Sequence, residues 1–309
     1  MQERILVVGA ADMDLLMNMH LLPRAGETAV EDNRFGYSAG GGGTLSALSM
    51  TDLGASPILA ARVGNDSHGA ALMRLYEKAG MNPHNITVDP RAATGLRVSM
   101  QEDSGNSRVI YYPGANRNLQ LSDVERVLVT EQPEALYINA EIPVETLIGT
   151  VRLASSRGVP VFLDGGGIDP DFPLHGLSGL EFFCADDKDI YALTGTFPAG
   201  TDSCLKAAVA LEKRVRARYY VIKLGDRGLF VYDGKYCHMV PGYGVRMPEN
   251  MPLPEALAPA LLLEYLRDGR DVLVACRFAM SLAALLVKNG ADPNYFPTTD
   301  EIRDFAARH

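Results

Sequence analysis

Residues 135–167 are ALYINAEIPVETLIGTVRLASSRGVPVFLDGGG, in which two short apolar runs flank a longer segment. The pattern predicts a strand over Ala135–Asn139, a helix over Glu145–Arg157 and a second strand over Val159–Leu163, which ends in a run of glycines. Strand–helix alternation is typical of parallel sheets, whose neighbouring strands need a crossover connection. We therefore expect an α/β fold around a mostly parallel sheet.

Other segments extend this pattern in both directions. Arg4–Gly9 has the continuous apolar run of a buried parallel strand, while Tyr219–Leu224 and Leu229–Tyr232 predict a hairpin. Apolar residues recur at helical spacing over 256–266, which predicts a helix. Pro254 precedes this segment and Gly269 follows it, as is typical of helix ends. Gly95–Gln101 and Ser107–Tyr112 flank a polar turn and predict a second hairpin, in a small β lid.

Composition limits the class of function. The chain has 309 residues, of which 47% are hydrophobic and 22% charged, and these values are ordinary for a globular protein. A net charge of −9 argues against a nucleic-acid-binding surface and against an anionic membrane partner. Length alone allows one large domain or two smaller ones.

Cysteine usage and hydropathy predict a compartment. Cys184, Cys204, Cys237 and Cys276 are widely spaced without any Cys-x-x-Cys pair, which favours free thiols and a reducing, cytoplasmic location. We see neither a signal peptide nor an apolar run long enough to span a membrane. The six histidines lack metal-ligand spacing, so a structural zinc is not expected.

Glycines and carboxylates follow the predicted strand ends, where ligands bind in open α/β sheets. Residues 9–14 do not supply the Gly-x-Gly-x-x-Gly of a dinucleotide site, which excludes a nicotinamide-dependent dehydrogenase of that type. Gly40–Gly43 precede a predicted helix, and glycines there let backbone amides approach a ligand. On the sequence pattern alone, Asp14 is a solvated loop carboxylate.

Several motifs together resemble the ribokinase-like (PfkB) family of small-molecule kinases over nearly the whole chain. They are the turn Pro23–Glu27, the glycine run Gly40–Gly43, the strand end Val63–Asp66, the loop Lys223–Gly228 and the passage Val240–Pro293. The resemblance implies a single domain over 1–309, with a three-layer α/β/α sandwich and a small β-sheet lid from segments of about 15–40 and 94–112. It also implies an ATP- and Mg-dependent phosphotransferase that acts on a hydroxyl of a sugar, nucleoside or similar metabolite.

The resemblance assigns roles to particular residues. It implies substrate binding by Asp14, Gly41, Gly42 and Glu141, nucleotide binding by Asp186, Lys223, Gly225 and Gly228, and a catalytic base at Glu255. Asp186 and Asp189 occupy the place of the family's Asn-x-x-Glu and are candidate magnesium ligands; their alternative role is to stabilise a helix N-terminus by charge. Glu141 has the alternative interpretation of a surface residue in a connecting loop.

Three departures from the family pattern affect the chemistry. Leu45 stands where the family has a substrate-binding Asn, Asp186 replaces an Asn, and Pro252-Leu253-Pro254-Glu255 replaces Gly-Ala-Gly-Asp. Proline has no N–H, so the amides that would bind an anion at this turn are lost. We therefore keep two hypotheses: a kinase with impaired or altered transfer, and a catalytically silent protein that closes on a small polyol-type ligand. In both, the lid is also a candidate homodimer contact.

Overall fold

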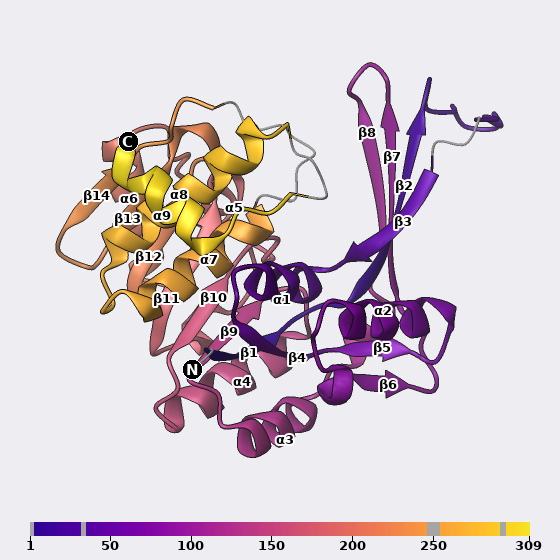
Figure 1. Ribbon diagram of the computed structural model, residues 1–309, viewed down its shortest axis with the longest axis horizontal. Coiled ribbons are helices and arrows are strands. Elements are labelled where there is room, and N and C mark those ends of the chain that lie inside the picture. The colour runs from indigo at the N-terminus through magenta and orange to yellow at the C-terminus, as the bar shows by residue number, and fades with distance from the viewer. Residues whose placement is uncertain (1–2, 32–34, 246–253, 291–294) are drawn as a thin grey trace.

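The computed structural model describes residues 3–31, 35–245, 254–290 and 295–309, and the side chains of Pro254 and Glu255 are outside that description. An eight-stranded sheet runs through the body of the molecule (Figure 1). Its order is β14 (Cys237–Val240), β13 (Leu229–Tyr232), β12 (Ala217–Lys223), β11 (Leu180–Asp186), β10 (Val161–Asp164), β9 (Ala135–Asn139), β1 (Arg4–Val8) and β4 (Ser56–Ala60). The pairs from β12 to β4 are parallel and the two pairs at the β14 edge are antiparallel.

Helices cover both faces of this sheet and enclose two apolar cores. One core packs α1 (Gly42–Asp52), α2 (Ser67–Lys78), α7 (Pro254–Arg267), α8 (Val272–Lys288) and α9 (Thr299–Arg308). The other packs α3 (Leu121–Glu131), α4 (Val144–Ser156), α5 (Asp187–Thr194) and α6 (Thr201–Glu212). Within β1, Ile5 and Val7 join the first core while Leu6 and Val8 join the second. Burial on both faces explains why such strands are continuously apolar in sequence.

The expected lid is a separate four-stranded sheet, and Figure 1 shows it projecting from the body. Its order is β3 (Phe35–Gly40), β2 (Asp12–Met19), β7 (Gly95–Glu102) and β8 (Ser107–Tyr112). A short parallel pair, β5 (Arg62–Gly64) and β6 (Thr87–Asp89), forms a third sheet. β2 begins four residues after β1 ends, so the lid starts at the carboxyl edge of the central sheet. The three-layer α/β fold with a small β lid is thus confirmed.

The backbone conformation at position 41, at this edge, requires glycine. Gly41 precedes α1 with φ of 82°, and a Cβ there would lie 2.6 Å from the carbonyl oxygen of Ala10. Only glycine adopts this conformation without strain and without that clash. The amino end of α1 therefore lies directly against the loop that follows β1.

Two further expectations concern the whole chain. All four cysteines are free, with Cys237 partly exposed and the other three buried. Within the described residues, every helix is too short or too polar to cross a membrane.

Candidate functional site

The carboxyl ends of the parallel strands carry the polar residues of the candidate site. Strand register places Asn139 beside Asp164, and Asp186 beside Lys223. Glu141 follows β9 by two residues, and β2 carries Asp12 and Asp14 away from the end of β1. The edge therefore gathers most of the predicted site residues, as expected for an open α/β sheet.

Asp12 is a buried carboxylate that was not predicted. It is 1% exposed, and its Oδ1 accepts a hydrogen bond of 2.5 Å from Nδ2 of Asn116. Oδ1 of Asn116 in turn accepts from the amide of Ala11 at 2.9 Å. Burial, reinforced by the charge of Glu141, raises the pKa of Asp12 to about 7. Asp12 thus changes its charge near neutral pH rather than in acid.

Asp14, a predicted substrate ligand, lies on the same face of β2 because it is two residues farther along the strand. A Cβ on Gly40 would lie 2.1 Å from Oδ1 of Asp14, and a Cβ on Gly95 would lie 1.7 Å from Oδ1 of Asp12. Glycine at both positions leaves room for the two carboxylates against the neighbouring lid strands.

Glu141 is held at the amino end of α1. Its Oε2 accepts a hydrogen bond of 2.7 Å from the amide of Gly42. Burial raises the pKa of Glu141, while the Gly42 amide and the guanidinium of Arg97 oppose that shift. The contact places the partly buried Glu141 against the predicted glycine run.

Asn139 adds a second polar group beside Gly42. Its side chain is buried, and neither its Nδ2 nor its Oδ1 has a hydrogen-bond partner within the described parts of the chain. A Cβ on Gly42 would lie 2.1 Å from that Nδ2 and 3.1 Å from Oε2 of Glu141. Buried amides without a partner are costly, so this group is suited to bind a ligand or water.

Lys223 does not extend freely from the strand edge. Its Nζ lies 3.1 Å from Oδ1 and 3.2 Å from Oδ2 of Asp164, and the hydroxyl of Tyr137 donates to Oδ2 at 3.1 Å. Burial would lower the pKa of Lys223, but the Asp164 carboxylate more than offsets burial and the pKa lies above its usual value. The ammonium group is thus already neutralised by an internal partner.

Asp186 and Asp189 form the start of α5. Oδ1 of Asp186 accepts from the amide of Asp189 at 2.9 Å, so Asp186 is the N-cap of that helix. Burial, followed by the hydrogen bond and charge of Asp186, raises the pKa of Asp189 to about 7. Among the residues with described positions, no group of three or more His, Cys, Asp or Glu side chains is arranged to hold a metal. The pair suits Mg²⁺ only with water or phosphate as further ligands.

The predicted nucleotide loop is a short turn after β12. Gly225 and Gly228 have φ of 63° and 105°, and a Cβ on Gly228 would lie 2.0 Å from the carbonyl oxygen of Val240. The guanidinium of Arg227 donates to the carbonyls of Pro198 and Ala199 and to Asp187. These contacts fix the loop to the connection between α5 and α6.

The predicted base lies at the limit of the described structure. α7 begins at Pro254, as expected from its place in the first turn, and Glu255 follows it. The side chain of Glu255 lies outside the described structure, and so do residues 249–253, which include most of the segment that differs from the family pattern.

A cleft of about 730 Å³ lies between the lid and the carboxyl edge. Arg97, Val109 and Tyr111 line it from the lid, and Arg117, Glu141 and residues of its loop line it from the body. Its volume is in the range that small-molecule ligands occupy.

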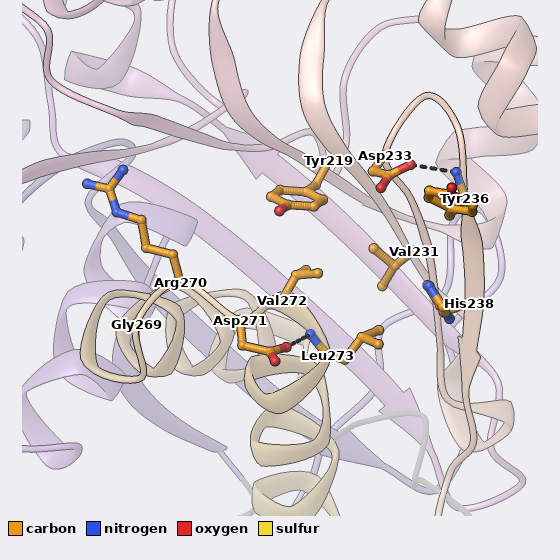
Figure 2. Close-up of a pocket in the computed structure, with 10 residues that line it drawn as sticks. All are labelled: Tyr219, Val231, Asp233, Tyr236, His238, Gly269, Arg270, Asp271, Val272 and Leu273. Carbon is orange, nitrogen blue, oxygen red and sulfur yellow. Dashed lines mark hydrogen bonds between the residues drawn. The ribbon is translucent and has the colours of Figure 1, made fainter.

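A second hollow, of about 420 Å³, lies near the opposite end of the strands (Figure 2). The carboxylate of Asp233 accepts from the amide of Tyr236, and that of Asp271 accepts from the amide of Leu273. Figure 2 shows Arg270 extending away from the other labelled side chains. The carboxylates of Asp233 and Asp271 complete local turns and Arg270 points elsewhere, so these charged groups do not converge on the hollow.

Comparisons with known proteins identify the family of the chain. The family model described as pfkB family carbohydrate kinase matches residues 2–246. A ribokinase of Arabidopsis thaliana is 25% identical over 300 residues, which cover 94% of this chain and 78% of the relative. A deoxyribokinase of Salmonella typhi is 21% identical over 97% of this chain and 98% of its own length.

A solved structure shows the same fold. The structure of Arabidopsis thaliana ribokinase complexed with ribose and ATP superimposes with a TM-score of 0.87 at 21% identity, covering 99% of each chain. The family match over 2–246 spans more than half of the sequence. The chain belongs to the pfkB family of carbohydrate kinases.

Proposed function

We propose that this protein binds a polyol-type metabolite, such as a sugar or nucleoside, and transfers phosphate from ATP to one of its hydroxyls. The observation that carries the proposal is the bond between Glu141 and the Gly42 amide, beside the buried carboxylate of Asp12 and under the lid strand that bears Asp14. Carboxylates are acceptors for hydroxyl donors, and hydrogen bonds to charged groups are the stronger ones. Relatives named ribokinase and deoxyribokinase support the sugar class.

The substrate roles follow from that arrangement. Asp14 and Glu141 accept hydrogen bonds from substrate hydroxyls, and Gly41 and Gly42 keep the amino end of α1 close to the ligand. Asn139 contributes an amide that can both donate and accept. Arg97 orients or neutralises a carboxylate, as its effect on Glu141 suggests.

The nucleotide roles belong to the loop after β12 and to the start of α5. Gly225 and Gly228 let the backbone approach the nucleotide, and Asp186 with Asp189 would hold Mg²⁺ through water and phosphate oxygens. When bound, Mg²⁺ would neutralise charge on the transferring phosphate. Lys223 contributes charge only in combination with Asp164, because the two form an internal pair. The structural relative whose complex contains ATP supports ATP as the donor.

The second hypothesis is a catalytically silent protein that still closes on its ligand. It rests on Pro252-Leu253-Pro254, which removes amide donors where the family forms its anion hole, and on Leu45, which cannot bind a hydroxyl. Glu255 remains as a candidate base, but its longer side chain shifts the carboxylate by about an ångström. Slow transfer and complete loss are both consistent with this motif.

We further propose that the chain acts as one domain and forms a homodimer through the lid. The face of the lid turned away from Asp14 carries Tyr37, Ile110 and Tyr112, which are 57%, 61% and 53% exposed. Exposed apolar rows on a sheet mark interaction surfaces. Light scattering tests this: Ile110→Lys would give a monomer, and a wild-type chain that is already monomeric would refute the contact.

A ligand screen followed by an activity assay tests the principal proposal. Sugars and nucleosides would be screened by thermal shift, and each ligand that stabilises the protein would be assayed for ADP formation with MgATP. ADP formation that depends on a ligand supports phosphate transfer. Ligand binding without ADP formation above the ATP-only background supports the silent protein.

A further inference from the structure

The cleft between lid and body carries charged groups of both signs. Glu141 lines the cleft, and the carboxylates of Asp12 and Asp14 lie near Glu141. Arg97 of the lid and Arg117 of the body line the same cleft. The net charge of the chain is −9, so two arginines facing one cleft are a local departure from its acidic character.

Strand register explains how Arg97 reaches the site. Asp14 of β2 pairs with Arg97 of β7, and Arg97 pairs with Tyr111 of β8. Directly paired residues project to the same face of a sheet. Asp14, Arg97 and Tyr111 therefore form one row across the lid that faces the cleft, and Arg97 lies between the acidic residue and the aromatic one.

Both guanidinium groups remain available for a ligand. Neither Arg97 nor Arg117 forms an ion pair with any residue of the described ranges, although Arg97 is close enough to lower the pKa of Glu141. Other arginines nearby are engaged; Arg62, for example, forms ion pairs with Asp89 and Asp123. Arg117 also lines an adjoining hollow with Arg91 and with the ion pair of Arg62 and Asp89.

The chemistry of these groups selects a kind of ligand. Hydroxyls satisfy carboxylates, but a neutral polyol offers no charge to a guanidinium when the lid excludes water. The planar fork of arginine matches carboxylate and phosphate oxygens. We propose that the cleft takes a polyol that carries an anionic group, phosphate or carboxylate, with its hydroxyls on Asp14 and Glu141 and its anionic group on Arg97 and Arg117. This inference rests on the proposed function, of which it narrows the substrate class.

Calorimetry with four probes tests this directly on the full-length chain. The probes are D-ribose, D-ribose 1-phosphate, D-ribonate and inorganic phosphate. We expect at least one anionic polyol to bind about tenfold or more tightly than ribose, the expected gain from a charge-assisted hydrogen bond. Whichever of ribose 1-phosphate and ribonate binds more tightly identifies the anionic group. Equal binding of ribose and both anionic polyols would overturn the inference, and so would inorganic phosphate binding as tightly as they do.

Arginine variants supply the second measurement. Arg97→Met and Arg117→Met should each weaken binding of the anionic polyol by about 10- to 100-fold. Arg117→Met should change the affinity for ribose by less than about threefold, and Arg97→Met should affect ribose less than it affects the anionic polyol. Arg91→Met is the matched control: Arg91 is exposed and lines only the adjoining hollow. An equal loss of affinity for ribose and for the anionic polyol would show that the arginines only position the lid. That result would overturn the inference.

The outcome separates this inference from the proposal on which it rests. ADP formation with ribose but no preference for the anionic polyols would leave phosphate transfer standing and refute the anionic class. Tight, Arg97-dependent binding of an anionic polyol without ADP formation would support the anionic class and refute transfer.

Discussion

The two halves of the candidate site differ in how much of their polar chemistry is already satisfied. On the side of α1, Asn139 has unpartnered side-chain atoms within the described structure, and Asp12 and Glu141 have pKa values raised by burial. On the side of α5, Asp164 neutralises Lys223 and Asp186 caps a helix. The side chain of Asn139 in the first half has no partner among the described residues, whereas Lys223, Asp164 and Asp186 in the second half are engaged within the fold. A raised pKa does not separate the halves, because burial also raises the pKa of Asp189.

This contrast agrees with the positions at which the sequence differs from the family pattern. By the roles proposed above, the half on the side of α1 (the substrate half) keeps Asp14, Glu141 and the glycine run, with Leu45 as the departure noted there. The proposed phosphate half has Pro252-Leu253-Pro254 where we expect the glycine turn of the family. The family match ends at residue 246, ahead of that turn. A protein under selection to bind rather than to transfer would retain the first half and lose the second.

Breaking the Lys223–Asp164 pair should have the largest effect. Lys223→Met leaves a buried carboxylate without its cation, and we expect a loss of about 3–5 kcal/mol in the free energy of unfolding. Urea denaturation measures it. Lys78→Met, at an exposed helix end, is the control and should stay within about 0.5 kcal/mol. A Lys223 variant as stable as this control would mean that the pair does not stabilise the strand edge.

The double variant Lys223→Met/Asp164→Asn then sharpens the comparison. It removes both charges while keeping an acceptor for the hydroxyl of Tyr137, so stability should largely return. We expect this variant to fold, so MgATP binding to it tests the nucleotide role of Lys223. Unchanged affinity would assign Lys223 to the fold alone.

Restoring the anion-binding turn should have the next largest effect. Replacing Pro252-Leu253-Pro254 with Gly-Ala-Gly and Glu255 with Asp adds two amide donors and shortens the base. Turnover of an identified substrate should rise by about two orders of magnitude or more. Gly-Ala-Gly with Glu255 retained is the control that separates the amides from the base. A wild-type chain that already turns over at about ten per second would refute the silent hypothesis.

Removing single carboxylates from the substrate half should have an intermediate effect. Asp14→Ala or Glu141→Ala should weaken the binding of a polyol found in the screen by about 1.5–3 kcal/mol, because each change deletes hydrogen bonds to a charged group. Calorimetry measures the change, and the exposed Glu145→Ala is a matched control on the neighbouring helix. If neither variant alters affinity, the ligand binds outside this half.

The fold was largely predictable because it depends on local pattern. Doubly buried strands such as β1 and β9 are continuous apolar runs, and Pro254 predicts the start of α7 correctly. α9 was not predicted, although Thr298 and Glu301 form a capping box there that could have signalled its start.

The site was less predictable because its partners are distant in sequence. Lys223 and Asp164 are 59 residues apart, and nothing local indicates that they pair. Arg97 meets Asp14 only through the parallel register of β2 and β7, and Asn116 reaches Asp12 from a separate turn. Asp12 itself stands one residue from Met13 and two from Asp14, so the alternation of a strand could have assigned it to the face of Asp14.

The smallest expected effect concerns the charge of Asp12. Its folded-state pKa of about 7 lies above the ordinary value of 3.8, so the native state binds the extra proton between these two pH values. The stabilisation is therefore complete below about pH 4 and is lost as the pH rises through about 7. Between pH 6 and pH 8 the contribution of Asp12 falls by about 1.4 kcal/mol, and Asp12→Asn, which keeps an acceptor for Asn116, should remove this contribution. The contribution of Asp189, whose pKa is also raised to about 7, should remain in both proteins. Urea unfolding of both proteins at the two pH values measures the difference.

Asp52→Asn is the control. Asp52 is a second carboxylate whose pKa is raised by burial, but it lies at the far end of α1. If the Asp12→Asn protein loses as much stability as wild type between pH 6 and pH 8, then Asp12 is already ionised at pH 6. The buried carboxylate of Asp12 would then add its negative charge to that of Glu141 at every physiological pH.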